Sequence, residues 1–166
     1  MFKIPVYKPS LGDTERRNVI ECLDSTWISS KGTFVDKFEK SFSVYTGIAN
    51  CTSCSNGTTA LQLALLAAGL GPGDEIICPT FTYIASAASI CHAGATPVFV
   101  DSDPDSWLMS IDALEAAITP NTKAVMCVHL YMGVSNVDRI RAICDSHKLI
   151  MIEDCAEALG STYNNM

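Results

Sequence analysis

The sequence Ser55-Asn-Gly-Thr-Thr59 has the composition of an anion-binding turn. It follows a short apolar run that we expect to form a strand, and it precedes residues 60–70, which are nearly all helix formers. The first N–H groups of a helix have no partner within the helix and lie at the positive end of its dipole. Gly57 lets an anion approach the backbone closely, and Thr58 adds a hydroxyl donor. The alternative interpretation is an ordinary helix cap by Thr58 or by the serine that begins the segment.

Two further polar groups follow apolar runs. Asp154 comes after residues 149–152, so its carboxylate is expected at the floor of a pocket, where burial is unfavourable unless the charge is paired. A cationic ring nitrogen is one suitable partner, because a charge-assisted hydrogen bond keeps both groups ionised; a lysine, an arginine or a helix end is the alternative. The sequence Pro79-Thr-Phe-Thr-Tyr83 places two aromatic side chains after another run, where a ring stacks on a flat ligand or joins the core.

These three groups require a scaffold that brings them together. We expect strands at 48–53, 75–78, 96–100, 123–129 and 149–152, and helices at 13–24, 34–45, 58–70, 82–93, 110–118 and 136–147. The alternation predicts an α/β fold with a mainly parallel sheet covered by helices on both faces. Ligands of such sheets bind at the carboxyl ends of the strands, which is where all three groups are expected.

Composition limits the class of protein. Hydrophobic residues make up 48% and charged residues 17% of the 166 residues, which is typical of a folded domain with a large core. The 11 basic residues are scattered and the net charge is -7, which argues against nucleic acid as a partner. No apolar run has membrane-spanning length, and residues 1–13 lack the apolar core of a secretion signal. We therefore expect a cytoplasmic protein that does not enter a membrane.

The eight cysteines agree with that expectation. Most of them lie within apolar runs, where cysteine behaves as a small hydrophobic residue, and buried free thiols indicate a reducing compartment. Cys51 and Cys54 form a lone C-x-x-C sequence. Because no second pair follows at zinc spacing, we expect no metal site.

Together and in this order, the motifs resemble the N-terminal part of the DegT/DnrJ/StrS sugar aminotransferases. The family binds pyridoxal 5′-phosphate (PLP) and has the aspartate aminotransferase (type I) fold, and the resemblance spans nearly the whole chain. It is carried by Trp27-Ile-Ser-Ser-Lys-Gly32, Ser55-Asn-Gly-Thr-Thr-Ala-Leu61, Gly71-Pro-Gly-Asp-Glu75, Pro79-Thr-Phe-Thr-Tyr-Ile-Ala-Ser86, Gly94-Ala-Thr-Pro-Val-Phe-Val-Asp101, Val128-His-Leu-Tyr131 and Ile152-Glu-Asp-Cys-Ala-Glu-Ala158. The first of these and Glu157 are most similar to the perosamine synthase branch of the family.

The resemblance implies a role for each site residue. Gly57 and Thr58 would bind the phosphate of PLP, Tyr83 would lie against the pyridine ring, and Asp154 would pair with the protonated ring nitrogen. Glu157 would lie near the ring and the amino group being transferred. The implied reaction moves an amino group from an amino acid such as glutamate to a nucleotide-linked 4-keto-6-deoxy sugar, with the cofactor alternating between PLP and pyridoxamine phosphate (PMP).

One part of the family pattern is missing. The family's Schiff-base lysine is expected roughly 25 to 30 residues beyond the position of Asp154, in a Ser-x-x-x-x-Lys context, whereas this sequence ends at Met166. None of the lysines at 3, 8, 31, 37, 40, 123 and 148 matches that position, so no residue is assigned as the nucleophile. We expect residues 1–33 to form an N-terminal arm, helix and loop. Residues 34–166 would form an incomplete PLP-binding large domain that is inactive alone.

Further expectations accompany this assignment. The complete enzyme would be a homodimer whose sites use residues of both subunits, as the family is. A sugar dehydratase is an alternative, because some relatives carry histidine in place of the lysine. A binding or assembly module without catalysis is another. His129 is interpreted as a structural residue, and the sequence Met132-Gly-Val134 departs from the Gly and Pro that usually follow the Tyr131 position in the family.

Overall fold

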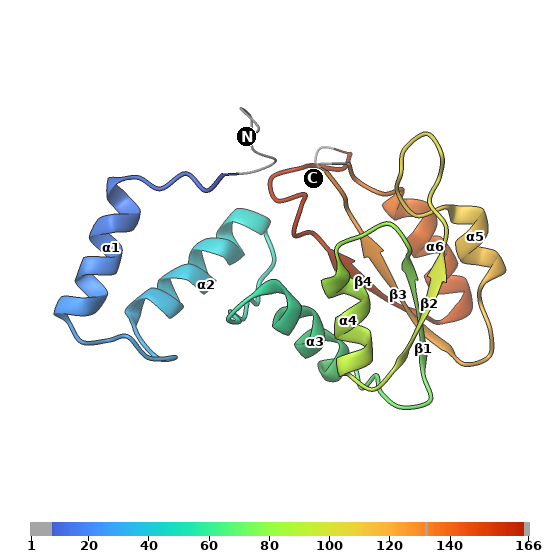
Figure 1. Cartoon of the computed structure of the whole chain (residues 1–166), viewed down its shortest axis with the longest axis horizontal. Helices are drawn as coiled ribbons and strands as arrows, with labels where there is room; N and C mark the ends of the chain where they lie inside the picture. Colours follow the sequence, from blue (N-terminus) through green and yellow to red (C-terminus); the bar gives the residue numbers. More distant parts are fainter. Residues whose placement is uncertain (1–7, 132, 165–166) are drawn as a thin grey trace, which may run out of the picture. The chain divides into compact units, whose positions relative to one another are not determined.

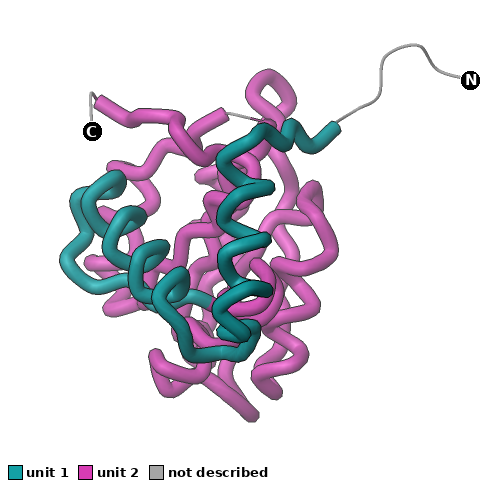
Figure 2. Tube along the Cα trace, turned by 90° about the vertical axis from the view of Figure 1, so that its left-hand side faces the viewer, with its two compact units in different colours: residues 1–53 teal, residues 54–166 magenta. Residues whose placement is uncertain are grey.

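The computed structural model describes residues 8–131 and 133–164. Its internal contacts divide the chain into two compact units, residues 1–53 and 54–166, which are coloured separately in Figure 2. Every residue expected to bind the cofactor lies in the second unit. The boundary between the units follows residue 53. The division into an N-terminal region 1–33 and an incomplete large domain 34–166 stays a prediction.

The first unit contains two helices, α1 (Asp13–Asp24) and α2 (Thr33–Thr46), close to the predicted ranges. Gly47 ends α2 with a φ of 73°, a left-handed conformation that glycine adopts without strain. The predicted strand at 48–53 is wrong, because this segment pairs with no strand of the described chain. Its polar groups bond to side chains of α2 instead: the N–H and hydroxyl of Ser53 donate to Oε1 of Glu39 at 2.7 and 2.8 Å.

The second unit is built on a four-stranded sheet (Figure 1). Its strands are β1 (Glu75–Pro79), β2 (Thr96–Val100), β3 (Thr122–Val128) and β4 (Ile150–Asp154). They are arranged in the order β2-β1-β3-β4, and all three pairings are parallel. The parallel sheet and its carboxyl edge confirm the predicted fold class.

Helices cover both faces of this sheet, as predicted (Figure 1). On one face, α3 (Gly57–Ala67) and α4 (Ile84–His92) pack against Ile76, Cys78 and Met126. On the other, α5 (Ile111–Ala116) and α6 (Val137–His147) pack against Ile77 and Val125. Successive residues of β1 and β3 therefore enter opposite cores, which explains why these strands are continuous apolar runs.

The helices of the second unit are shorter than predicted, and α3 shows the reason. It was expected to reach residue 70 but ends at Ala67, and Gly69 then turns the chain with a φ of 76°. Leu70 follows that turn and is buried in the same core as Leu65. The apolar pattern thus continues past the end of the helix, which is why the sequence overestimates its length.

The cysteines are less uniformly buried than expected. Only Cys78, Cys127 and Cys144 are buried, and burial raises the pKa of the Cys78 and Cys127 thiols to about 12. All eight cysteines are free thiols. Across the described residues, no helix is long and apolar enough to cross a membrane.

Candidate functional site

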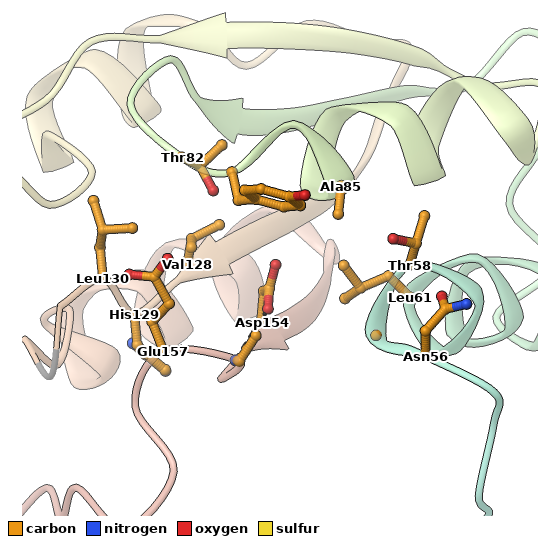
Figure 3. A pocket seen from close by; sticks show the side chains of 13 residues that line it. Asn56, Thr58, Leu61, Thr82, Ala85, Val128, His129, Leu130, Asp154 and Glu157 are labelled. Carbon is orange, nitrogen blue, oxygen red and sulfur yellow. Dashed lines mark hydrogen bonds between the residues drawn. The ribbon is translucent and has the colours of Figure 1, made fainter. Parts of the chain in front are cut away.

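A cavity of about 390 Å³ opens at the carboxyl edge of the sheet. Its walls come from the N-terminus of α3, the segment between β1 and α4, the end of β3 and the segment after β4 (Figure 3). All five residues assigned to the site from the sequence line it. The lining residues are Asn56, Gly57, Thr58, Leu61, Thr82, Tyr83, Ala85, Val128, His129, Leu130, Asp154, Ala156 and Glu157.

The N-terminus of α3 forms one wall of this cavity. Asn56 caps the helix, because its Oδ1 accepts the N–H of Thr59 at 3.0 Å. The sequence had suggested Ser55 or Thr58 as the cap, so that assignment is wrong. With the Thr59 N–H bonded to the cap, the N–H groups of Gly57 and Thr58 are those that lack an intrahelical acceptor. A Cβ added at Gly57 would meet no atom within 4 Å, so there is room in front of this backbone for an anion.

Asp154 ends β4 at the opposite wall and is only 8% exposed. Its carboxylate accepts two hydrogen bonds, from the hydroxyl of Ser86 to Oδ2 at 2.8 Å and from the N–H of Ala156 to Oδ1 at 3.2 Å. The salt bridges among the described residues do not include Asp154. In the part of the chain that the structure describes, neither a lysine nor an arginine therefore forms a salt bridge with this buried carboxylate, which lines the cavity.

The two aromatic residues after β1 have separate roles. Tyr83 lines the cavity and is 70% exposed. Phe81 instead joins a cluster outside the cavity, where its ring centroid lies 5.4 Å from that of Trp107 and 6.3 Å from that of Tyr131. The sequence pattern does not indicate that these three rings meet, because they come from three different loops.

Glu157 lies on the segment after β4 and lines the cavity near His129 and Leu130 (Figure 3). Its Oε2 accepts the backbone N–H of Tyr131 at 3.2 Å. This bond connects the loop after β3 with the segment after β4. Glu157 therefore lines the cavity, and its carboxylate is oriented by the neighbouring loop.

A second polar cluster lies beside the cavity and was not predicted. His129, Glu153 and Cys155 place their ligand atoms within 4.8 Å of one another. Nε2 of His129 lies 3.2 Å from Glu153, whose other oxygen lies 3.4 Å from Arg141. Hydrogen bonding to Cys155 and Glu153 raises the pKa of His129 to about 9, and the same histidine lowers the pKa of Glu153.

The geometry of this cluster suits a hydrogen-bond network better than a metal site. In the neutral form of the ring, Nδ1 of His129 accepts the backbone N–H of Ser135 at 3.2 Å, so the ring proton is on Nε2. A metal on Nε2 would need its proton on Nδ1, in conflict with this bond. Arg141 also occupies one oxygen of Glu153. The buried His129 therefore joins two loops of the sheet edge, in agreement with its structural interpretation.

Comparison with known proteins gives the same assignment. The model of the DegT/DnrJ/EryC1/StrS aminotransferase family matches residues 9–166. GDP-perosamine synthase of Escherichia coli O157:H7 is 54% identical over 163 residues, which are 98% of this chain and 45% of that protein. The chain thus spans less than half the length of this curated relative.

Solved structures share both the fold and the sequence. The aminotransferase from Psychrobacter cryohalolentis has a TM-score of 0.90 at 38% identity, over 93% of this chain and 40% of that one. NtdA from Bacillus subtilis with bound cofactor PMP has a TM-score of 0.85 at 34% identity, over 92% of this chain and 36% of that one. The cavity at the carboxyl edge, the match over residues 9–166 and these relatives lead to one conclusion: the chain belongs to the DegT/DnrJ/EryC1/StrS aminotransferase family.

Proposed function

We propose that this chain forms the cofactor-binding part of a PLP-dependent aminotransferase acting on nucleotide-linked 4-keto-6-deoxy sugars. The amino group would come from an amino acid such as glutamate. The support for the sugar class is the 54% identity to a GDP-perosamine synthase, and the support for the cofactor is the geometry of the cavity.

The observation that carries the proposal is the environment of Asp154. Its carboxylate is nearly buried, accepts two hydrogen bonds and, among the described residues, has no cationic partner. A buried carboxylate is stable when a cation completes its environment. The protonated pyridine nitrogen of PLP supplies such a cation, and the bound ring then acts as an electron sink during amino transfer.

The other walls fit the remainder of the cofactor. The N–H groups of Gly57 and Thr58, with the Thr58 hydroxyl, would hold the phosphate at the positive end of α3. Tyr83 would lie against the ring, since an aromatic side chain packs well on a flat heterocycle. Glu157 would lie beside the amino group and accept a proton or hydrogen bond from it.

The cavity also limits what the chain does alone. None of the described residues that line it is a lysine. Lys148 precedes β4 and therefore lies at the other end of the sheet from Asp154. We propose that this chain binds PLP without a covalent bond and supports no amino transfer by itself. No observation favours the dehydratase or the module without catalysis, so neither is proposed further.

The partners of the complete enzyme follow from the same proposal. They are the keto sugar nucleotide, the amino-acid donor and a second subunit in a homodimer, with residues 34–166 as part of the large domain. Large apolar side chains that are exposed on α3 and α4, namely Leu63, Leu66 and Ile84, support such an interface. The eight free thiols support a cytoplasmic setting.

Titration of the chain with PLP, followed by its absorption spectrum, tests the proposal. We expect Asp154→Asn to weaken PLP binding by about tenfold or more, because a charged hydrogen bond is lost, and to leave the affinity for inorganic phosphate unchanged. Asp145→Asn, which removes an exposed charge from α6, is the matched control and should bind PLP normally. Equal PLP affinity of the wild type and Asp154→Asn would contradict the proposal.

A second measurement tests the absence of a nucleophile. After borohydride treatment of the PLP-loaded chain, we expect no lysine to carry the mass of the cofactor. Stoichiometric labelling of one lysine would show that the chain contains the residue that we find missing from the cavity.

A further inference from the structure

Ser86 contacts the central carboxylate from outside the cavity. It lies on α4, is fully buried, and donates its hydroxyl proton to Oδ2 of Asp154 at 2.8 Å. It is not among the residues that line the cavity, whereas Asp154 is. Ser86 therefore contacts the site through hydrogen bonds to lining residues and does not line the cavity itself. The N–H of Ala156 bonds the other oxygen, so each carboxylate oxygen has one donor of the protein.

Thr82 extends this contact into a chain of hydroxyl groups. Its Oγ1 lies 3.0 Å from Oγ of Ser86. A hydroxyl has one proton, and an ionised carboxylate has none to give. Because Ser86 donates its proton to Asp154, Thr82 must donate to Ser86. The Thr82 proton thus points to Ser86 and the Ser86 proton to the carboxylate, an arrangement that polarises the Ser86 hydroxyl further.

Ser89 shows what a purely structural serine on the same helix looks like. It is also fully buried on α4, but its hydroxyl donates to the backbone oxygen of Ser86 at 2.9 Å. That local bond satisfies the side chain within the helix. The Ser86 hydroxyl instead bonds Asp154 on a different element, the edge strand β4. The two serines therefore form a matched pair for experiment.

We propose that Ser86 is a positioning residue that holds the Asp154 carboxylate oriented toward the ring nitrogen of PLP. Thr82 directs the Ser86 proton. The inference rests on the proposed function, since the ring nitrogen is the partner toward which the carboxylate is held. With Oδ1 and Oδ2 each fixed from the protein side, the carboxylate cannot turn away from the cavity, and its remaining lone pairs accept the pyridinium proton.

Cofactor titrations of matched variants test this inference. Ser86→Ala, Ser89→Ala, Asp154→Asn and the double variant Ser86→Ala with Asp154→Asn are titrated with PLP and separately with inorganic phosphate. We expect Ser86→Ala to weaken PLP binding about tenfold and Ser89→Ala to change it less than twofold. Phosphate affinity should be unchanged in both. In the double variant, Ser86→Ala should add nothing to the effect of Asp154→Asn, because it acts through that carboxylate.

The absorption of the bound cofactor gives a readout that a structural role would not change. The pH at which the bound ring loses its nitrogen proton should fall in Ser86→Ala and stay unchanged in Ser89→Ala. Thermal unfolding of each variant checks its fold. If Ser86→Ala does not fold, Ser86→Cys preserves the volume with a weaker donor, and we expect a smaller shift in the same direction.

The outcomes separate this inference from the proposed function. Wild-type chain that binds PLP in an Asp154-dependent way, with Ser86→Ala indistinguishable from Ser89→Ala, would overturn the inference alone. So would an additive effect of Ser86→Ala in the Asp154→Asn background. Wild-type chain without Asp154-dependent PLP binding would overturn the proposed function, and the inference with it.

Discussion

The backbone N–H of Tyr131 donates a hydrogen bond to Oε2 of Glu157 at 3.2 Å. Tyr131 has a φ of 50°, a left-handed conformation that a tyrosine adopts only when its surroundings hold it there. The loop after β3 and the segment after β4 are thus joined at the mouth of the cavity. A carboxylate assigned to chemistry from the sequence also holds the backbone of a neighbouring loop.

We expect Glu157→Ala to lower the free energy of unfolding by about 1 kcal/mol, because the Tyr131 N–H loses its acceptor. Glu157→Gln retains an oxygen at this position and should lower it by less than about 0.5 kcal/mol. Urea unfolding of the three proteins measures the difference. Equal losses in the two variants would show that the charge, and not the acceptor, stabilises the loop.

Capping of α3 is predicted to affect the phosphate site. Asn56→Ala should lower the free energy of unfolding by about 1 kcal/mol and weaken the binding of inorganic phosphate, because the first turn of the helix loses its fixed geometry. Asn136→Ala is the control: Asn136 caps α6 in the same way, with Oδ1 accepting the Arg139 N–H at 3.2 Å. The Asn136→Ala variant should lose a similar amount of unfolding free energy and keep its affinity for phosphate. Calorimetric titration with phosphate distinguishes the two, and equal loss of affinity would contradict this account.

The sequence predicted the sheet and its edge because burial on both faces leaves a strong pattern. After Glu75 and Lys123, β1 and β3 continue as apolar runs, and a polar residue follows each strand, so the edge of a parallel sheet was recognisable. That rule placed Asp154 and Tyr83 together although they are distant in sequence. The apolar residues of the segment 48–53 also predicted a strand, and that prediction was wrong. The polar groups of this segment bond to side chains of α2 and not to a neighbouring strand.

The details of the site depended on contacts that leave no local pattern. Ser86 lies among small residues of α4 and looks like any helix-packing serine, and its bond to Asp154 arises only when the sheet brings β4 beside it. The same holds for His129 with Glu153 and Cys155. Asn56 was missed as a cap because Ser55 and Thr58 beside it are equally good cap residues.

The pair His129 and Glu153 predicts a pH dependence of stability. The pKa of His129 is raised from 6.5 to about 9 and that of Glu153 is lowered from 4.5. The stabilising effect of the ion pair between protonated His129 and Glu153 is therefore complete between about pH 4.5 and 6.5. It is lost as the pH rises through about 9, where the ring becomes neutral and Nδ1 accepts the Ser135 N–H. The difference in unfolding free energy between the wild type and Glu153→Gln should follow this course.

Arg141 and Cys155 complete the surroundings of the pair and serve as checks. Arg141→Gln removes the second cation at Glu153, and the loss of stability near pH 9 should remain in this variant. Cys155→Ala should move that loss to lower pH, because Cys155 is the largest cause of the raised pKa of His129. An NMR titration of the His129 ring measures the same value directly. A titration at or below pH 6.5 would contradict the assignment.

A contact between two of the family motifs explains why one of them needs glycine. Gly94 has a φ of 84°, and a Cβ added there would lie 3.2 Å from Cδ and Cγ of Pro72. Gly94→Ala should therefore combine left-handed strain, about 1–2 kcal/mol, with a clash against the proline ring. Gly69 is a matched control, with a φ of 76° and no atom within 4 Å of the added Cβ.

We expect Gly69→Ala to lose about 1 kcal/mol of unfolding free energy and Gly94→Ala clearly more, about 2–3 kcal/mol. The double variant Gly94→Ala with Pro72→Ala separates the two causes, because it removes the ring and leaves the strain. The difference in unfolding free energy between this double variant and Pro72→Ala should be as small as the loss caused by Gly69→Ala. Chemical unfolding of the five proteins measures these differences, and an undiminished loss in the Pro72→Ala background would show that the proline ring is not what requires glycine at position 94.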